Sequence, residues 1–267
     1  MIYKCKSNAK INISLKIVGM KNGYHLLNSV FIPIDLCDDM EFSDSDTDEI
    51  IGFDFPKENN LIYKAIELIR KKYNINKCVS VKVKKNIPSK AGLGGGSSNC
   101  AFTLKALNTL WHLKLSTEAL MKLACELGSD VPFFLLNTPS YVTGRGEIIE
   151  PIEYNPIEGI IIFDNAYFST PIVYSNFDKM NESYSKDYPI YNGKIDYIND
   201  LEKAIANMEG YDIVQEGLKD LKETNASFYM LSGSGGSVFG IYNKVDLDQA
   251  YNTLKEKHKF VYRFKSI

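Results

Sequence analysis

The 267-residue sequence has few of the residues that build metal sites and disulfide frameworks. It contains three histidines and five cysteines, an odd number. No two cysteines form a Cys-x-x-Cys pair, and no histidine stands at metal-ligand spacing from any of them. We therefore expect reduced core thiols in a cytosolic protein rather than a disulfide framework or a zinc site. The cysteines are Cys5, Cys37, Cys78, Cys100 and Cys125.

Long hydrophobic runs and an excess of positive charge are also missing. The longest apolar stretches, at 131–136 and 160–163, fall far short of the roughly 20 residues that cross a bilayer. The N-terminus lacks the apolar stretch of a signal peptide. Lysine plus arginine number 31 against 33 acidic residues, so no basic field would attract nucleic acid. We expect a soluble, cytoplasmic protein with neither membrane nor nucleic acid as partner, whose anionic ligands are bound by local donors.

Apolar residues make up 45% of the chain, enough for a sizeable core. The alternation over 9–16 predicts a strand with Lys10 and Asn12 on one face, and Asn22-Gly23 predicts a hairpin turn before a strand at 26–34. The whole pattern is that of an α+β protein, divided within the proline-containing segment 150–156. Helices are expected at 61–73, 99–111, 117–127, 199–208, 213–223 and from 246, and strands at 79–83, 159–163, 228–231, 238–242 and 260–264, with a hairpin over 141–152.

The stretch from Pro88 to Asn99 joins a predicted strand to the start of a predicted helix and contains four glycines within five positions. Glycines let backbone N–H groups approach an anion, and a helix N-terminus adds unsatisfied donors. The alternative is a flexible turn capped by serine, but so many glycines are costly in a turn, so the pattern favours phosphate binding. It matches neither the Walker A loop nor the dinucleotide fingerprint.

A second loop, Ser232-Gly233-Ser234-Gly235-Gly236-Ser237, separates two predicted strands. A plain hairpin accounts for it about as well as a binding loop does. Two serine- and glycine-rich loops in one chain nevertheless suit a ligand that is held from two sides.

Three further features are ambiguous from the residues alone. Asp130, before the apolar run at 131–134, is more typical of a capping or turn aspartate than of a functional one. A lysine on the polar face of a strand, such as Lys10, is usually solvated. Tyr24-His25 beside a turn could stack on a flat base, but such neighbours more often only pack. His112 and His258 are expected to be structural or solvated, and no hydrolase triad is present.

Taken together, these segments resemble the GHMP kinases nearly end to end. The glycine loop is typical of the superfamily, while Gly-Tyr-His and Asn-Asp-Leu-Glu favour the members that phosphorylate the C2 hydroxyl of a cytidine-diphosphate methylerythritol in non-mevalonate isoprenoid synthesis. The matching segments are 9–12, 23–25, 91–99, 128–134, 199–202 and 232–236.

The resemblance implies a two-domain GHMP kinase fold with ATP and substrate in the cleft between the domains. The N-terminal domain, 1–152, would be ribosomal protein S5 domain 2-like and would bind ATP. The C-terminal domain, 153–267, would be ferredoxin-like.

The resemblance also assigns roles to individual residues. Asp130 would accept the proton of the substrate hydroxyl, and Lys10 would be its charge partner. Mg²⁺ would be held mainly by the ATP phosphates, with Ser97 or Ser98 as the candidate protein ligands. The residues expected to bind ATP are Pro88, Gly92, Leu93, Gly94, Gly95, Gly96, Ser97 and Ser98. Those expected to bind the substrate are Asn12, Tyr24, His25, Tyr174, Ser232, Gly233, Ser234 and Gly235.

Several alternatives remain open at this point. Another GHMP kinase, such as homoserine or mevalonate kinase, would share the ATP loop, and a catalytically silent nucleotide-binding protein could share the fold. Purely structural glycine loops would predict no ATP binding. Cys100 and Ser129 each replace a commoner alanine without removing a role. The sequence decides neither between monomer and homodimer nor what the polar segment 181–193 does.

Overall fold

The computed structural model describes residues 1–180, 184 and 195–267. The polar segment 181–193 therefore lies outside the described residues except for Tyr184. The chain forms two compact units, each assembled from separate segments. Unit 1 comprises Met1–Ala9, Leu36–Ser89 and Gly94–Thr138, and unit 2 comprises Lys10–Asp35, Lys90–Leu93 and Pro139–Ile267. These units are defined by contacts within each unit, and their limits differ from the predicted domains 1–152 and 153–267. The predicted domain boundary at 152 stays a prediction.

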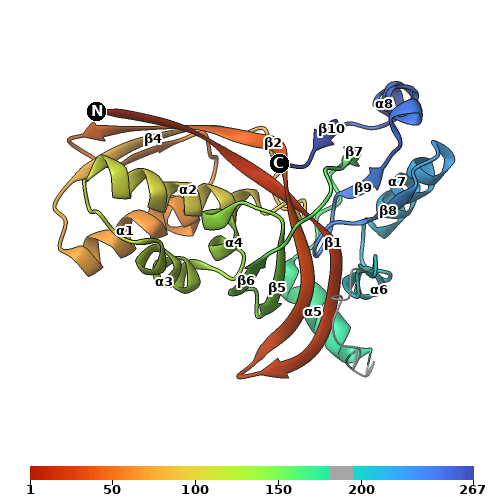
Figure 1. Ribbon diagram of the computed structural model, residues 1–267, viewed down its shortest axis with the longest axis horizontal. Helices are drawn as coiled ribbons and strands as arrows, with labels where there is room; N and C mark the ends of the chain where they lie inside the picture. Colours follow the sequence, from red (N-terminus) through yellow and green to blue (C-terminus); the bar gives the residue numbers. More distant parts are fainter. Residues whose placement is uncertain (181–183, 185–194) are drawn as a thin grey trace. The chain divides into compact units, whose positions relative to one another are not determined.

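A long hairpin opens the chain and supplies strands to both units (Figure 1). Strand β1 spans Ile2–Lys21 and β2 spans Tyr24–Ser45. Asn22 and Gly23 connect them with φ angles of 52° and 77°, the pair of positive values that a type I′ turn requires. The predicted hairpin is confirmed, with strands longer than the sequence pattern indicated.

In unit 1, the second half of β2 pairs antiparallel with β4 (Cys78–Lys84), and β3 (Glu49–Ile51) runs parallel to β4. A short 3₁₀ turn, η1 (Lys57–Asn59), precedes the helices. Figure 1 shows α1, α2 and α3 grouped on one side of β4. Apolar side chains from strands and helices are fully buried there, and this burial stabilises the unit. The helices are α1 (Leu61–Tyr73), α2 (Gly95–Leu110), α3 (Thr117–Leu127) and α4 (Val131–Leu136).

Local capping explains why two of these helices were predicted correctly. Asn60 accepts a hydrogen bond from the Ile62 N–H at the start of α1, and Ser116 accepts one from the Ala119 N–H at the start of α3. Helix α2, in contrast, begins at Gly95 and not at the predicted Asn99. Glycine has a low helix propensity, so the sequence pattern did not extend the helix into the loop. Helix α4 was not predicted.

Unit 2 contains an antiparallel four-stranded sheet in the order β10-β7-β9-β8, and β5 and β6 extend the first half of β2. Its core gathers side chains from the sheet, the helices and the end of β1 near Leu15. The strands are β5 (Ser140–Gly144), β6 (Ile148–Pro151), β7 (Glu158–Ile162), β8 (Phe228–Leu231), β9 (Val238–Ile241) and β10 (Val261–Lys265). The helices are α5 (Thr170–Lys179), α6 (Leu201–Ala204), α7 (Tyr211–Glu223) and α8 (Lys244–Lys257).

Two helices of unit 2 differ from the prediction. The helix expected over 199–208 is only the single turn α6, and Asn199 ahead of it instead makes a bridge with Leu15 of β1. Helix α5 was not predicted, although Pro171 stands in its first turn, where proline is tolerated.

The structural expectation for His258 is confirmed. Its Nδ1 lies 2.5 Å from Asp164 Oδ2 and its Nε2 lies 3.1 Å from Asp220 Oδ2, so the ring joins the end of α8 to two other segments. All five cysteines are unbridged thiols, but only Cys100 is buried; the expectation that they lie in the core holds for that residue alone. Within the part of the chain that the structure describes, every helix is too short or too polar to cross a membrane.

Candidate active site

The polar face of β1 forms a buried hydrogen-bonded chain in unit 2. The Lys10 ammonium donates to Asn12 Oδ1. The Asn12 amide in turn donates to Ser29 Oγ at 3.1 Å, and Ser29 donates to the Ser14 carbonyl. The Lys10 side chain also lies over the Phe31 ring, with Nζ 4.7 Å from the ring centroid. Lys10 is only 3% exposed, so the interpretation of Lys10 as a solvated lysine is wrong.

The second glycine-rich loop contacts residues 91 and 92 of the first one in unit 2. Ser237 donates to the Ala91 carbonyl from its backbone N–H at 3.1 Å and from its hydroxyl at 2.5 Å. Ser232 Oγ donates to the Gly92 carbonyl at 3.2 Å. The first loop is also tied to β1, because the Lys10 N–H donates to the Leu93 carbonyl at 3.0 Å. Lys10 therefore lies where both loops converge.

Gly92 is the tightest point of this junction. Its φ is +76°, and a Cβ atom placed on it would lie 2.0 Å from the Ser232 carbonyl oxygen. An L side chain is disfavoured by this backbone conformation and excluded by the neighbouring loop. Glycine is thus required at position 92 by the structure itself, apart from any ligand.

The rest of the first loop belongs to unit 1. Gly94 has a φ of 72° and precedes α2 without a capping side chain. The first N–H groups of α2 therefore lack a side-chain acceptor, and they belong to glycine and serine residues, which suits phosphate binding. Ser98 is buried: its N–H donates to the Gly94 carbonyl at 2.9 Å, and its hydroxyl accepts from Ser7 at 2.7 Å. Ser97 is partly exposed, so its hydroxyl suits a ligand better than that of Ser98.

Asp130, also in unit 1, occupies the N-cap position of α4, but its carboxylate makes no capping hydrogen bond with that helix. The capping half of the interpretation is therefore wrong, but Asp130 does lie in a turn, in which the Val131 N–H donates to the Gly128 carbonyl at 3.3 Å. Asp130 is partly exposed, and the four residues after it are all buried. Its carboxylate thus lies at the edge of an apolar segment that holds its backbone in place.

The predicted base-reading residues gather at the tip of the β1–β2 hairpin and along α5 in unit 2. His25 Nε2 lies 2.7 Å from Asp178 Oδ1, and the His25 and Tyr174 rings have centroids 4.8 Å apart. Tyr174 and Asp178 are four residues apart on α5, which places both on one helix face. Tyr24 is 53% exposed, and Arg145 lies over its ring at 5.1 Å. The structure thus brings Tyr174 beside His25. Tyr24 is exposed instead and contacts Arg145.

Four residues near the predicted positions were not identified from the sequence. Ser29 orients Asn12, and Thr170 Oγ1 lies 2.8 Å from Ser234 Oγ. Asp178 and Arg145 contact His25 and Tyr24. Only Asp178 had a usable signal, its spacing of four residues from Tyr174, and that signal requires knowing that 170–179 is helical.

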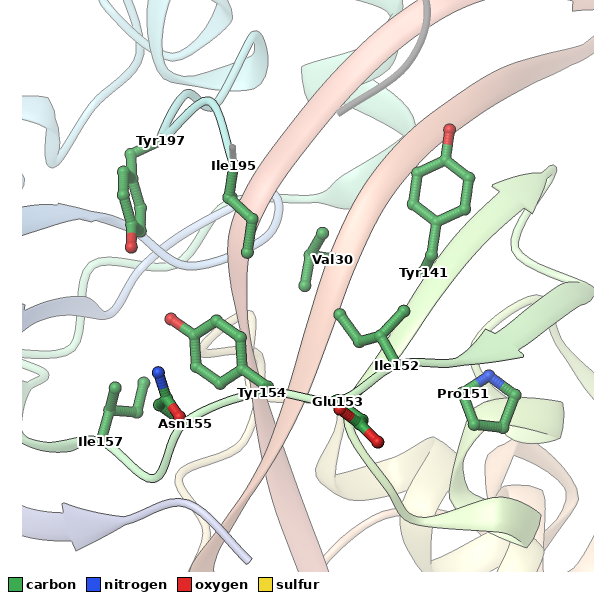
Figure 2. A pocket seen from close by; sticks show the side chains of 10 residues that line it. All are labelled: Val30, Tyr141, Pro151, Ile152, Glu153, Tyr154, Asn155, Ile157, Ile195 and Tyr197. Atoms are coloured by element: carbon green, nitrogen blue, oxygen red, sulfur yellow. The ribbon is translucent and has the colours of Figure 1, made fainter. Parts of the chain in front are cut away.

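A separate pocket of about 930 Å³ opens in unit 2 along the segment that follows β6 (Figure 2). Val30 and Tyr141, neighbours in the β2–β5 register, form part of its wall. Tyr154 and Tyr197 share a hydrogen bond on another side, and burial, aided by that bond, raises the pKa of Tyr154. None of the predicted site residues belongs to the wall. The lining consists of Val30, Tyr141, Pro151, Ile152, Glu153, Tyr154, Asn155, Ile157, Ile195 and Tyr197.

Comparisons with known proteins identify the family of the chain. Residues 60–138 match the GHMP kinases N terminal domain. The chain is 35% identical to 4-diphosphocytidyl-2-C-methyl-D-erythritol kinase of Thermoanaerobacter pseudethanolicus, over 99% of this chain and 96% of the relative. It is 38% identical to the protein of the same name from Thermodesulfovibrio yellowstonii, over 92% of each chain. A crystal structure of 4-(cytidine 5'-diphospho)-2C-methyl-D-erythritol kinase superposes with a TM-score of 0.84 at 27% identity, covering 99% of both chains.

The fold and the glycine loop therefore define a GHMP kinase, as the sequence resemblance implied. The identity of 35% along nearly the whole chain is more specific. The chain belongs to the family of 4-diphosphocytidyl-2-C-methyl-D-erythritol kinases.

Proposed function

We propose that the protein transfers the γ-phosphoryl group of ATP to the C2 hydroxyl of 4-diphosphocytidyl-2-C-methyl-D-erythritol, a step of non-mevalonate isoprenoid synthesis in the cytoplasm. The observation that carries the proposal is the similarity to kinases of this name over 99% of the chain. The convergence of the two glycine loops on Lys10 and Asn12 supports it.

The chemical step is assigned to Asp130 and Lys10. Asp130 accepts the proton of the C2 hydroxyl as the oxygen attacks the γ-phosphorus, and the bond between the γ-phosphorus and the β–γ bridging oxygen breaks to release ADP. Lys10 offsets negative charge on the carboxylate and the transferring group. Its ammonium, buried beside Asn12 and the Phe31 ring, is held in one geometry before substrate arrives.

ATP is assigned to the loop from Pro88 to Ser98. N–H groups at the start of α2 suit the phosphates, and Gly96 has no atom within 4 Å of the position of a Cβ, which leaves room for an anion. Mg²⁺, when bound, neutralises phosphate charge. The described residues contain no cluster of three or more acidic, histidine or cysteine ligands, so the metal would be held mainly by phosphate oxygens, with Ser97 as the better-placed hydroxyl.

Cytosine is assigned to His25, Tyr24 and Tyr174. A His25 ring that donates from Nε2 to Asp178 presents Nδ1 as an acceptor, which suits the exocyclic amino group of cytosine. The exposed Tyr24 ring offers a stacking surface. Asn12 would contact the methylerythritol end, and the loop from Ser232 to Gly235 would contact the diphosphate.

Asp130→Asn tests the assignment of the base. The substitution preserves shape but cannot accept the proton, so kcat should fall by about 10²–10⁴-fold, while the ATP dissociation constant stays unchanged. The measurements are steady-state ADP release and ATP binding by calorimetry. Asp212→Asn, which changes an exposed aspartate in the first turn of α7, is the control and should keep full turnover. Near-normal kcat in Asp130→Asn would refute the assignment.

A further inference from the structure

The segment Asn199-Asp200-Leu201-Glu202, which contributed to the family resemblance, is assigned no binding or catalytic role by the proposed function. On one side it is bonded to β1. The Leu15 N–H donates to the Ile198 carbonyl at 2.7 Å, and the Asp200 N–H donates to the Leu15 carbonyl at 2.9 Å. The Asp200 carboxylate accepts from the Ile17 N–H at 2.8 Å. The segment is thereby fixed to the strand that carries Lys10 and Asn12.

On its other side the same segment holds the second glycine loop. The Asn199 amide donates to the Leu231 carbonyl at 3.0 Å and to the Gly233 carbonyl at 2.8 Å. Its Oδ1 accepts from the Leu201 N–H at 3.0 Å. The Leu231 N–H donates to the Glu202 carboxylate. The N–H and the carbonyl of Leu231 are therefore both hydrogen-bonded to this one segment. The Asn199 side chain is buried, and both its NH₂ group and its Oδ1 are hydrogen-bonded.

Gly233 is the point where this bonding meets the proposed site. A Cβ atom on Gly233 would lie 3.3 Å from Asn12 Oδ1 and 3.4 Å from Lys10 Nζ, so its backbone packs directly against both side chains. In a trans peptide the N–H points opposite to the C=O. Because Asn199 binds the Gly233 carbonyl, the Ser234 N–H of the same peptide points away from Asn199.

We propose that Asn199 is a positioning residue for the phosphoryl transfer. By holding the Leu231 and Gly233 carbonyls, it fixes the glycine loop against Lys10 and Asn12 and directs the Ser234 N–H to the substrate diphosphate. The inference rests on the proposed function, because that function supplies the anionic ligand. A small displacement of such a loop would weaken substrate binding before it affected ATP.

Asn199→Asp tests the proposal. It keeps the acceptor for the Leu201 N–H but replaces the two amide donors by an oxygen that faces two carbonyl oxygens. The KM for the cytidine-diphosphate substrate should rise at least about tenfold, while the KM for ATP stays near the wild-type value. The matched control is Asn108→Asp in unit 1, because the Asn108 amide likewise donates to a backbone carbonyl, that of Leu115, and accepts from a backbone N–H.

Melting temperatures separate positioning from a purely structural role. If Asn199 only stabilises the fold, Asn199→Asp and Asn108→Asp should both have a lower melting temperature and an unchanged KM for the cytidine-diphosphate substrate. That result would overturn the proposal. If Asn199→Asp is too unstable to assay, Asn199→Ser removes the same donors without adding a charge, and an unchanged substrate KM in that variant overturns the proposal equally. Failure of the proposed function would be visible already in the wild type, which would then form no ADP with the cytidine substrate.

Discussion

Lys10 is buried, although a lysine on the polar face of a strand is usually solvated. A buried ammonium is costly unless it is paired, hydrogen-bonded or placed over an aromatic face. Lys10 is hydrogen-bonded to the Asn12 amide and lies over the Phe31 ring. These contacts hold the ammonium in a defined position, which suits the role that we propose for Lys10.

Tyr24 is expected to stack on the cytosine base of the substrate. Replacing Tyr24 by alanine removes an exposed ring that packs with Arg145. It should weaken binding of the cytidine substrate by about 1–3 kcal/mol, the range for stacking on a base, and leave ATP binding unchanged. Calorimetric titration of both variant and wild type measures this. Tyr24→Phe keeps the ring and is the control; unchanged affinity in Tyr24→Ala would assign the stacking to another aromatic residue.

Several strands, turns and helix starts could be predicted from local sequence patterns. The alternation along β1, the Asn22-Gly23 turn and the caps of α1 and α3 all depend on neighbouring residues, and the structure confirms them. The pattern also placed Lys10 and Asn12 on one face, and their hydrogen bond confirms it.

Elements and contacts that depend on residues far apart in the sequence could not be predicted. Helix α5 buries only Val173 and Phe177, too few apolar positions to give a clear helical period. His25 meets Asp178 across 153 residues of sequence, and Asn12 meets Ser29 across 17. No propensity encodes such pairs, because the fold alone brings their strands and helices together.

The glycines of the first loop serve two different needs. Gly92→Ala places a Cβ 2.0 Å from the Ser232 carbonyl at a φ of +76°, and it should destabilise the fold by more than about 1–2 kcal/mol, the cost of the left-handed conformation alone. Gly96→Ala meets no atom within 4 Å, so stability should be kept or improved while ATP binding weakens.

Thermal unfolding and ATP titration of both variants measure these effects. Gly92→Ala with wild-type stability would show that the contact between the two loops is dispensable. Gly96→Ala with unchanged ATP affinity would remove position 96 from the phosphate site.

For the whole molecule, stability should depend on pH through Asp48. Its hydrogen bonds with the Arg70 guanidinium hold the pKa of the Asp48 carboxyl below its usual range. A carboxyl whose pKa is lower in the folded state stabilises the fold above its unfolded pKa of about 3.9, and this contribution is lost as pH falls through the folded value.

The melting temperatures of wild type and Asp48→Asn should therefore differ most near neutral pH and converge in acid. Thermal unfolding monitored by circular dichroism across that range tests the expectation. Asp54→Asn, at an exposed aspartate, is the control. A difference between wild type and Asp48→Asn that is the same at every pH would show that Asp48 acts through packing and not through its charge.

ADP release with Mg-ATP identifies the acceptor that the whole protein phosphorylates. The purified protein is given the cytidine-diphosphate methylerythritol substrate, homoserine, mevalonate or no acceptor in parallel. We expect ADP formation with the first acceptor alone. Turnover only with homoserine or mevalonate would keep the fold and the ATP loop but contradict the roles of Tyr24, His25 and Tyr174. ATP binding without turnover on any acceptor would contradict the kinase assignment itself.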